Sequence, residues 1–119
     1  MSHVAFSFKT RILISVLASS TLPLFAQNGA IQGRIVDPAS AVIANCTVQA
    51  IDDAKAVVVR KTMSGSDGAF QLQPLAPGTY TVTVEAPGMK KTQRTGVVLD
   101  VNQILNLGDI RMEVGAISE

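Results

Sequence analysis

The chain has 119 residues and a formal net charge of +1, and 16% of its residues are charged. This length fits one small domain, and the near-neutral charge argues against nucleic acid as the main partner. The sequence has one cysteine, Cys46, and one histidine, His3. An internal disulfide is therefore excluded, as is a zinc site built from several histidines or thiolates.

Residues 1–26 have the features of an export signal, expected as a signal-peptide helix. Lys9 and Arg11 form a basic start, and an apolar run then continues to a small residue, Ala26. The run Ile12–Ala26 has 15 residues, fewer than the ~20 that a membrane-spanning helix needs. We therefore expect a cleaved signal and a mature chain of 93 residues, exported to the periplasm or outer membrane or secreted.

Apolar and polar residues alternate in short segments after the signal, and this period of two predicts strands. Turn residues separate the segments, and Asp37-Pro38 ends the first because proline has no amide to donate. The first three predicted strands cover residues 31–35, 46–50 and 57–62, with a polar loop at 52–55 and a turn at 64–68.

The stretch from residue 66 to residue 88 holds two further alternations. Phe70 and Leu72 share one face of a short strand, and Tyr80, Val82, Val84 and Ala86 share one face of the next. These two strands are expected to form a half-buried antiparallel pair. Type II turns are predicted at Pro77-Gly78 and Pro87-Gly88, with a positive φ at each glycine.

The last two predicted strands follow a polar segment, Lys90–Thr95, which is typical of an exposed sheet edge. Val97, Leu99 and Val101 alternate in the first of them. Leu105 and Leu107 differ in parity from Ile110 and Met112, so a bulge at Gly108 is expected to bring both pairs to one face. The pattern predicts an all-β fold, a small antiparallel β-sandwich of about seven strands with Greek-key connections.

Few residues could support catalysis or bind a metal. Without a histidine after the signal, no nucleophile can pair with an imidazole base. Cys46 alternates with Val48 and Ala50, so we expect an inert, inward-facing thiol. Calcium binding by Asp52, Asp53 and Asp67 is conceivable, but turn chemistry alone explains Asp67. We expect no catalytic residue, metal or cofactor.

Binding candidates are equally sparse. Phe70 and Tyr80 have core-facing parity, so we expect core packing rather than a sugar-binding platform, with the tyrosine hydroxyl bonded at the rim. The basic residues Lys90, Lys91 and Arg94 form the candidate binding edge, for which a solvated edge strand is a simpler explanation than a phosphate site. Asn45-Cys46-Thr47 matches a glycosylation acceptor by letter, and we interpret this match as chance.

The spacing Gly33-x-Ile35-x-Asp37, followed by the pattern of glycine, proline and apolar residues from Asp67 to Gly88, resembles the carboxypeptidase regulatory-like domain. This family is a transthyretin-like β-sandwich grouped with carbohydrate-binding-like folds. Its second strand typically begins with Gly-Ala, and Asn45-Cys46 take those places here. Asn tolerates a positive φ, and Cys is small and apolar. The resemblance implies an accessory domain, because in metallocarboxypeptidases a separate domain carries the zinc ligands.

The chain is also similar to the extension that precedes the plug of some large TonB-dependent outer-membrane receptors. Those proteins begin with an export signal and continue past a segment like Val-Gly-Ala-x-Ser-Glu, which residues 114–119 match. Neither plug nor barrel fits in what remains. The resemblance therefore leaves two alternatives, a truncated or split receptor gene and an independent exported domain.

We expect three parts: a signal (1–26), the sandwich domain (27–113) and a C-terminal tail (114–119). The favoured function is a non-catalytic, exported interaction domain that captures a protein partner of the periplasm or outer membrane by strand addition. A carbohydrate-binding module is the alternative. A small hydrolase that uses Cys46 or Asp67 is the least favoured hypothesis.

Overall fold

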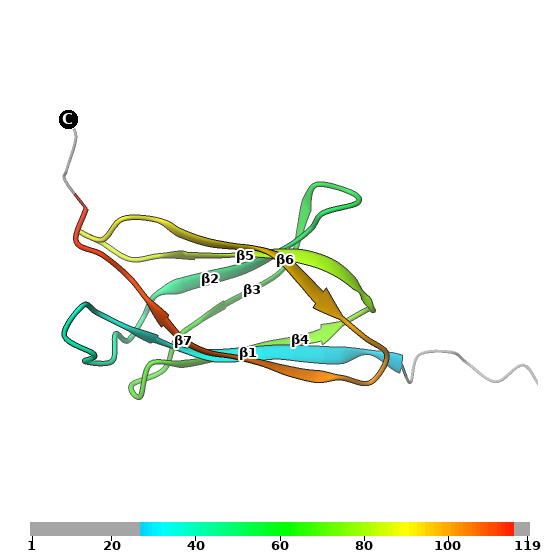
Figure 1. The fold of residues 1–119 in the computed structure, drawn as a ribbon, viewed down its shortest axis with the longest axis horizontal. Coiled ribbons are helices and arrows are strands. Elements are labelled where there is room, and N and C mark those ends of the chain that lie inside the picture. Colours follow the sequence, from blue (N-terminus) through cyan, green and yellow to red (C-terminus); the bar gives the residue numbers. More distant parts are fainter. Residues whose placement is uncertain (1–26, 116–119) are drawn as a thin grey trace, which may run out of the picture.

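Two β-sheets packed face to face form the fold of residues 27–115, which are the residues that the computed structural model describes (Figure 1). The strands are β1 (Gly29–Val36), β2 (Thr47–Asp52), β3 (Val57–Met63), β4 (Ala69–Leu75), β5 (Gly78–Glu85), β6 (Thr92–Leu99) and β7 (Ile104–Arg111). The all-β fold with seven strands is confirmed. The expected signal helix lies outside the described residues. Within residues 27–115, no helix has the length and apolar character needed to cross a membrane.

The strands form a three-stranded sheet in the order β4-β1-β7 and a four-stranded sheet in the order β3-β2-β5-β6. β2 pairs antiparallel with β3, which follows it in the chain, and with β5 on its other side; β5 pairs antiparallel with β6. One pair departs from the expected antiparallel arrangement, because β7 runs parallel to β1. The chain crosses from β6 in the four-stranded sheet to β7 in the three-stranded sheet. There β7 lies beside β1 and runs in the same direction.

The expected pairing of the strand around Phe70 with the strand around Tyr80 is wrong. β4 pairs with β1 in one sheet, and β5 pairs with β2 and β6 in the other. Their apolar faces meet across the interior instead of lying side by side. Alternation identifies the buried face of a strand, but both sheets of a sandwich bury a face in the same core.

The core consists of the inward-facing side chains of both sheets. Its largest fully buried members include Ile31, Ile35, Leu72, Leu99 and Ile110. Their burial supplies the main stabilisation, at ~1.5–3 kcal/mol for each large apolar side chain. Leu105 and Leu107 pack against the same core. The predicted bulge is confirmed, because Leu107 and Gly108 of β7 together oppose the single residue Gly33 of β1, and Gly108 has φ +75°.

One of the two predicted type II turns is present. Gly88 has φ +75°, and the amide of Met89 donates to the carbonyl of Ala86 at 3.1 Å. Gly78 has no positive φ; it begins β5 and pairs with Leu99. The expected continuation of β6 to Val101 is also wrong, because β6 ends at Leu99 and Val101 lies exposed in the turn to β7.

The segment before β2 is fixed by a buried serine. The Ser64 hydroxyl donates to the carbonyl of Ile43 at 2.8 Å and accepts from the amide of Cys46 at 2.9 Å. Asn45 between them has φ 61°, as its tolerance of positive φ predicted. This arrangement turns Cys46 into the core, where it is fully buried.

Candidate functional site

β6 is an outer strand of the four-stranded sheet, as the polar segment before it predicted. It is hydrogen-bonded to β5 on one side. Two residues of β6, Thr95 and Gly96, oppose the single residue Thr81 of β5, and Gly96 has φ +67°. This bulge divides β6 into a polar part, residues 92–94, and an apolar part, residues 97–99. A bulge and charged side chains are two ways in which edge strands resist unspecific pairing.

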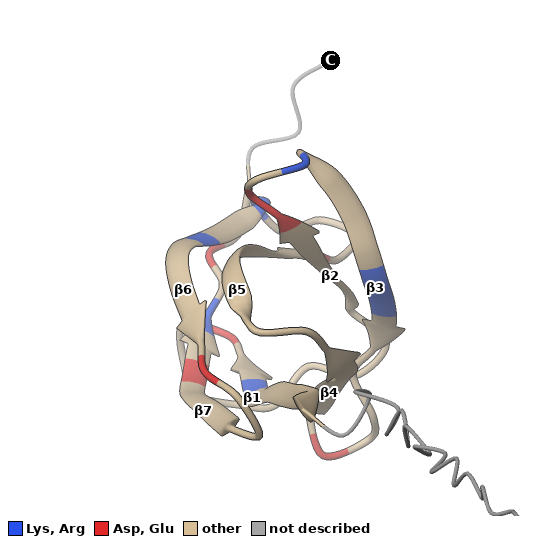
Figure 2. Ribbon diagram, turned by 90° about the vertical axis from the view of Figure 1, so that its right-hand side faces the viewer, with Lys and Arg blue, Asp and Glu red and all other residues tan. Residues whose placement is uncertain are grey.

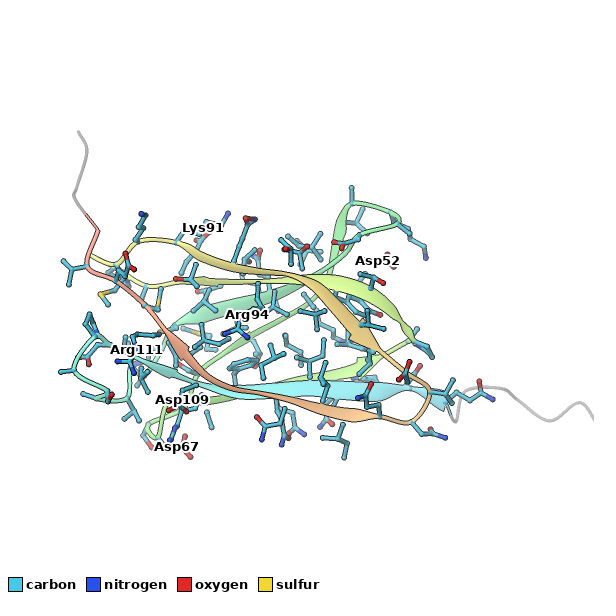
Figure 3. The ribbon with its side chains drawn as sticks, viewed as in Figure 1. Asp52, Asp67, Lys91, Arg94, Asp109 and Arg111 are labelled. Atoms are coloured by element: carbon cyan, nitrogen blue, oxygen red, sulfur yellow. The ribbon has the colours of Figure 1, made fainter. Side chains whose placement is uncertain are left out.

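The three basic residues of the candidate binding edge do not share one face. Lys90 lies exposed in the loop before β6, and Lys91, which Figure 3 labels, pairs with Glu85 at 3.4 Å. Arg94 lies opposite Val82, which is fully buried. Because directly opposite residues point to the same side of a sheet, Arg94 has the register of a core-facing residue. Its side chain is nevertheless exposed, because β6 is an edge strand, and Figure 3 shows it between the levels of the two sheets.

The two long sides of the sandwich differ (Figure 2). On one side the Arg60 Nε donates to the carbonyl of Pro74 at 2.9 Å and so joins β3 to β4 across the gap between the sheets. On the other side lie β6 and β7. No side-chain hydrogen bond or ion pair joins these two strands within residues 27–115. The side that holds Arg94 is therefore the less closed one.

The carboxylates considered for calcium do not come together. Asp52 accepts the amide of Ala54 at 3.0 Å, and Asp67 accepts the amide of Ala69 at 3.1 Å. Both bonds are the local turn bonds that aspartate commonly makes. Figure 3 shows Asp52 and Asp67 at opposite ends of the sandwich. In the described part of the chain, no group of three potential metal ligands is assembled.

The two aromatic residues of the described part, Phe70 and Tyr80, are core residues, as their parity predicted. Phe70 is 4% exposed and Tyr80 is 3% exposed. The Tyr80 hydroxyl donates to the carbonyl of Ala76 at 2.5 Å, which gives the phenol its expected partner at the rim. Burial raises the pKa of Tyr80 above 10.0, and the charge of Asp52 raises this pKa further.

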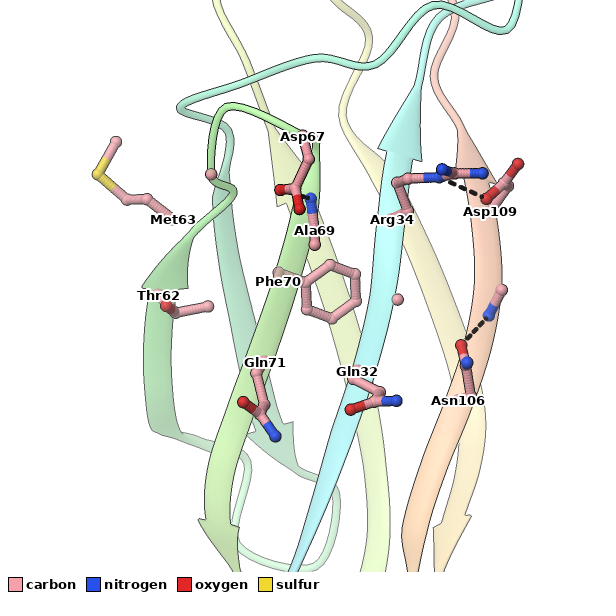
Figure 4. Close-up of a pocket in the computed structure, with 13 residues that line it drawn as sticks. Gln32, Arg34, Thr62, Met63, Asp67, Ala69, Phe70, Gln71, Asn106 and Asp109 are labelled. Atoms are coloured by element: carbon pink, nitrogen blue, oxygen red, sulfur yellow. Dashed lines mark hydrogen bonds and ion pairs between the residues drawn. The ribbon is translucent and has the colours of Figure 1, made fainter.

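A surface hollow that the sequence did not indicate lies over the three-stranded sheet (Figure 4). Gln32 on β1 is directly opposite Gln71 on β4 and Asn106 on β7, so three side-chain amides stand in one row across the sheet. Arg34 and Asp109 form the next row, joined by an ion pair of 3.1 Å. In the sequence, each of these residues is a polar residue at an outward-facing position of its own predicted strand, and nothing marks it as part of a site. Only the register between strands brings them together.

Gly33 makes the close packing beneath this hollow possible. A Cβ atom at this position would lie 2.9 Å from a ring carbon of Phe70 and 3.0 Å from the carbonyl oxygen of Gly108. The first distance is shorter than real Cβ contacts, and the second is tighter than most of them. The glycine of the Gly33-x-Ile35-x-Asp37 spacing is therefore required by the approach of an aromatic ring and of the β7 bulge.

The two packed sheets with their shared apolar core define a β-sandwich domain. Residues 30–113 match the sequence model of the carboxypeptidase regulatory-like domain. The chain belongs to this family. A search among curated proteins found no matching relative.

Solved structures confirm the fold. A chain of a type II cohesin–X-dockerin complex from Acetivibrio cellulolyticus is 22% identical, with a TM-score of 0.59. The match covers 72% of this chain and 58% of that one. The group B streptococcus pilus 2b backbone protein is 16% identical (TM-score 0.53, 74% and 42% covered). The hydroxyquinol 1,2-dioxygenase of Pseudomonas putida DLL-E4 is 13% identical (TM-score 0.57, 76% and 57% covered). At these identities the similarity establishes the sandwich and says nothing of activity.

Proposed function

We propose that this chain provides an exported, non-catalytic interaction domain that binds a protein partner by strand addition at β6. The unpaired edge of β6 carries the proposal. This strand has one hydrogen-bonded neighbour, β5, and the charged side chain of Arg94 is exposed on it. In strand addition, backbone hydrogen bonds supply affinity and neighbouring side chains supply selectivity.

The details of this edge restrict the partner. The bulge near Gly96 limits regular pairing to one part of β6 at a time. Lys91 is already paired with Glu85, whereas the described residues provide no ion pair for Arg94. A partner strand with an acidic side chain opposite Arg94 would pair with this charge and give β6 its second hydrogen-bonded neighbour. The same charge disfavours addition of a second copy of this strand.

The similar folds agree with an interaction role. By their titles, one neighbour comes from a cohesin–X-dockerin complex and another is the backbone protein of a pilus. Both belong to assemblies held by contacts between proteins. The family that residues 30–113 match is also described as a regulatory-like domain, which agrees with a non-catalytic role.

We further propose that the domain is located in the periplasm or at the outer membrane, as the N-terminal extension of a TonB-dependent receptor or a fragment of one. The signal-like residues 1–26 and the receptor-like residues 114–119 support this location. Gln27 and Gly115 lie at opposite ends of the sandwich, which suits a domain placed in series within a longer chain (Figure 1). The DNA downstream of the codon for Glu119 tests this origin. A reading frame for a plug and barrel would support it, and a frame unrelated to a receptor would contradict it.

Charge reversal tests strand addition. The tagged protein is used to capture partners from periplasmic and outer-membrane extracts, alongside Arg94→Glu and a matched control, Lys61→Glu. Lys61 lies exposed on β3, the opposite edge of the same sheet. We expect Arg94→Glu to lose the partner and Lys61→Glu to retain it. Hydrogen exchange on the complex should show slowed amides in β6. Equal retention by both variants, or protection at β3 instead, would rule out this edge.

A further inference from the structure

The hollow over the three-stranded sheet presents its amide row to solvent. Neighbouring strands lie ~4.8 Å apart, so the row of Gln71, Gln32 and Asn106 spans about 10 Å. Asn106 is oriented by the amide of Gly108, which donates to its Oδ1 at 2.8 Å. Its amino group is left to donate outward.

The two glutamines keep their full hydrogen-bonding capacity. Among residues 27–115, none bonds to the side-chain amide of Gln32 or Gln71. Beside them, the Nε of Arg34 donates to Oδ1 of Asp109. The two terminal amino groups of Arg34 and the Oδ2 atom of Asp109 therefore stay available for a ligand. The hollow therefore holds a dense set of paired donors and acceptors that the fold itself does not use.

The charges of the hollow exclude several kinds of ligand. Arg34 is the cation among its lining residues, and it is balanced by Asp109, with Asp67 nearby. An anion would meet no net positive charge. A divalent cation would find no cluster of three ligands, because none is assembled in the described part of the chain. The side-chain amides that residues 27–115 leave unpaired suit a neutral ligand that is rich in hydrogen-bonding groups.

We propose that this hollow binds a neutral oligosaccharide. An amide presents a donor and an acceptor side by side, and so do two adjacent sugar hydroxyls; the pair of Arg34 and Asp109 offers the same combination. Phe70 and Tyr80 are buried, so no ring of residues 27–115 is available for stacking. Binding then depends on hydrogen bonds that compete with water, and we expect a Kd on the order of 1 mM. This surface belongs to the other sheet, so the proposal stands apart from strand addition at β6.

The side-chain amides themselves are the probe. In a nitrogen–proton correlation NMR spectrum of the labelled protein, their signals are followed during titration with three hexasaccharides. These are the glucose hexamers with β-1,4 and α-1,4 linkages and the β-1,4 hexamer of N-acetylglucosamine. We expect the signals of Gln32, Gln71 and Asn106 to move and saturate with at least one of them. A glycine–serine peptide at equal concentration should leave them in place.

Two variants and a control separate this site from unspecific effects. Gln32→Ala and Gln71→Ala should each raise the Kd about 3- to 10-fold, as the loss of one or two hydrogen bonds requires. Gln93→Ala, on the exposed surface of β6, should leave it unchanged. Dispersed backbone signals show whether each variant is folded. The proposal is overturned if no hexasaccharide moves the three amides, if the peptide moves them equally, or if Gln32→Ala and Gln93→Ala bind alike.

Discussion

Replacing Ser64 with alanine should destabilise the domain far more than its small change in volume suggests. Ser64 is 2% exposed, and its hydroxyl links the carbonyl of Ile43 to the amide of Cys46. In Ser64→Ala the Cys46 amide keeps no acceptor. The Ile43 carbonyl keeps only a weak contact with the Cys46 thiol, at 3.7 Å.

The size of the effect follows from these two groups. A buried donor or acceptor that loses its partner costs ~1–3 kcal/mol. The Cys46 amide loses its hydrogen-bond acceptor, and the Ile43 carbonyl loses the stronger of its two donors. We therefore expect the free energy of unfolding to fall by about 2–4 kcal/mol. This loss is a large share of the ~5–15 kcal/mol that stabilises a typical domain.

Urea unfolding followed by circular dichroism measures the loss. At a slope of ~1–2 kcal/mol per molar urea, the midpoint should fall by about 2 M. Ser66→Ala is the matched control, because Ser66 is exposed in the turn that follows Ser64. If the two variants unfold within about 0.5 kcal/mol of each other, the buried hydroxyl does not hold this segment and the reasoning fails.

Two further predictions follow from the core. Gly33→Ala should lower the free energy of unfolding by about 1–3 kcal/mol, because its Cβ would collide with the Phe70 ring. Gly65→Ala, whose Cβ would meet nothing closer than 3.3 Å, should melt nearer to the wild type; equal melting temperatures would contradict the packing argument. Tyr80 is the single tyrosine, so ultraviolet absorbance reports its titration alone, and the midpoint should lie above 10.0. Because the folded pKa is the higher one, the stability that this phenol contributes is complete below pH 10 and is lost as the pH rises through the folded value. A midpoint at or below 10.0 would show that the ring is open to water.

The sequence predicted the strands well where one face of each strand is buried. Alternation identified the inward positions of Phe70, Leu72, Tyr80 and Val82, and parity alone located the bulge at Gly108. These features are local, because a side chain's face depends only on its position along its own strand. The polar start of β6 likewise predicted an edge.

Pairing was decided by tertiary structure. The sequence contained no signal that β4 joins β1 rather than β5, that β7 runs parallel to β1, or that Gly78 begins a strand. In a sandwich, the strands of both sheets show the same alternation of buried and exposed residues. This alternation therefore does not indicate to which sheet a strand belongs.

The two candidate surfaces show the same division. Proximity in the sequence marked Lys91 and Arg94 as one basic cluster, but Lys91 precedes β6 and pairs with Glu85, whereas Arg94 lies opposite the buried Val82. Gln71, Gln32 and Asn106 are scattered along the chain, and the registers of β4 and β7 against β1 bring them into one row. The sequence by itself determined which side chains face inward, since that is set within each strand. Only the packing of the whole chain decided which outward-facing side chains became neighbours, because strand register depends on contacts between residues far apart in sequence.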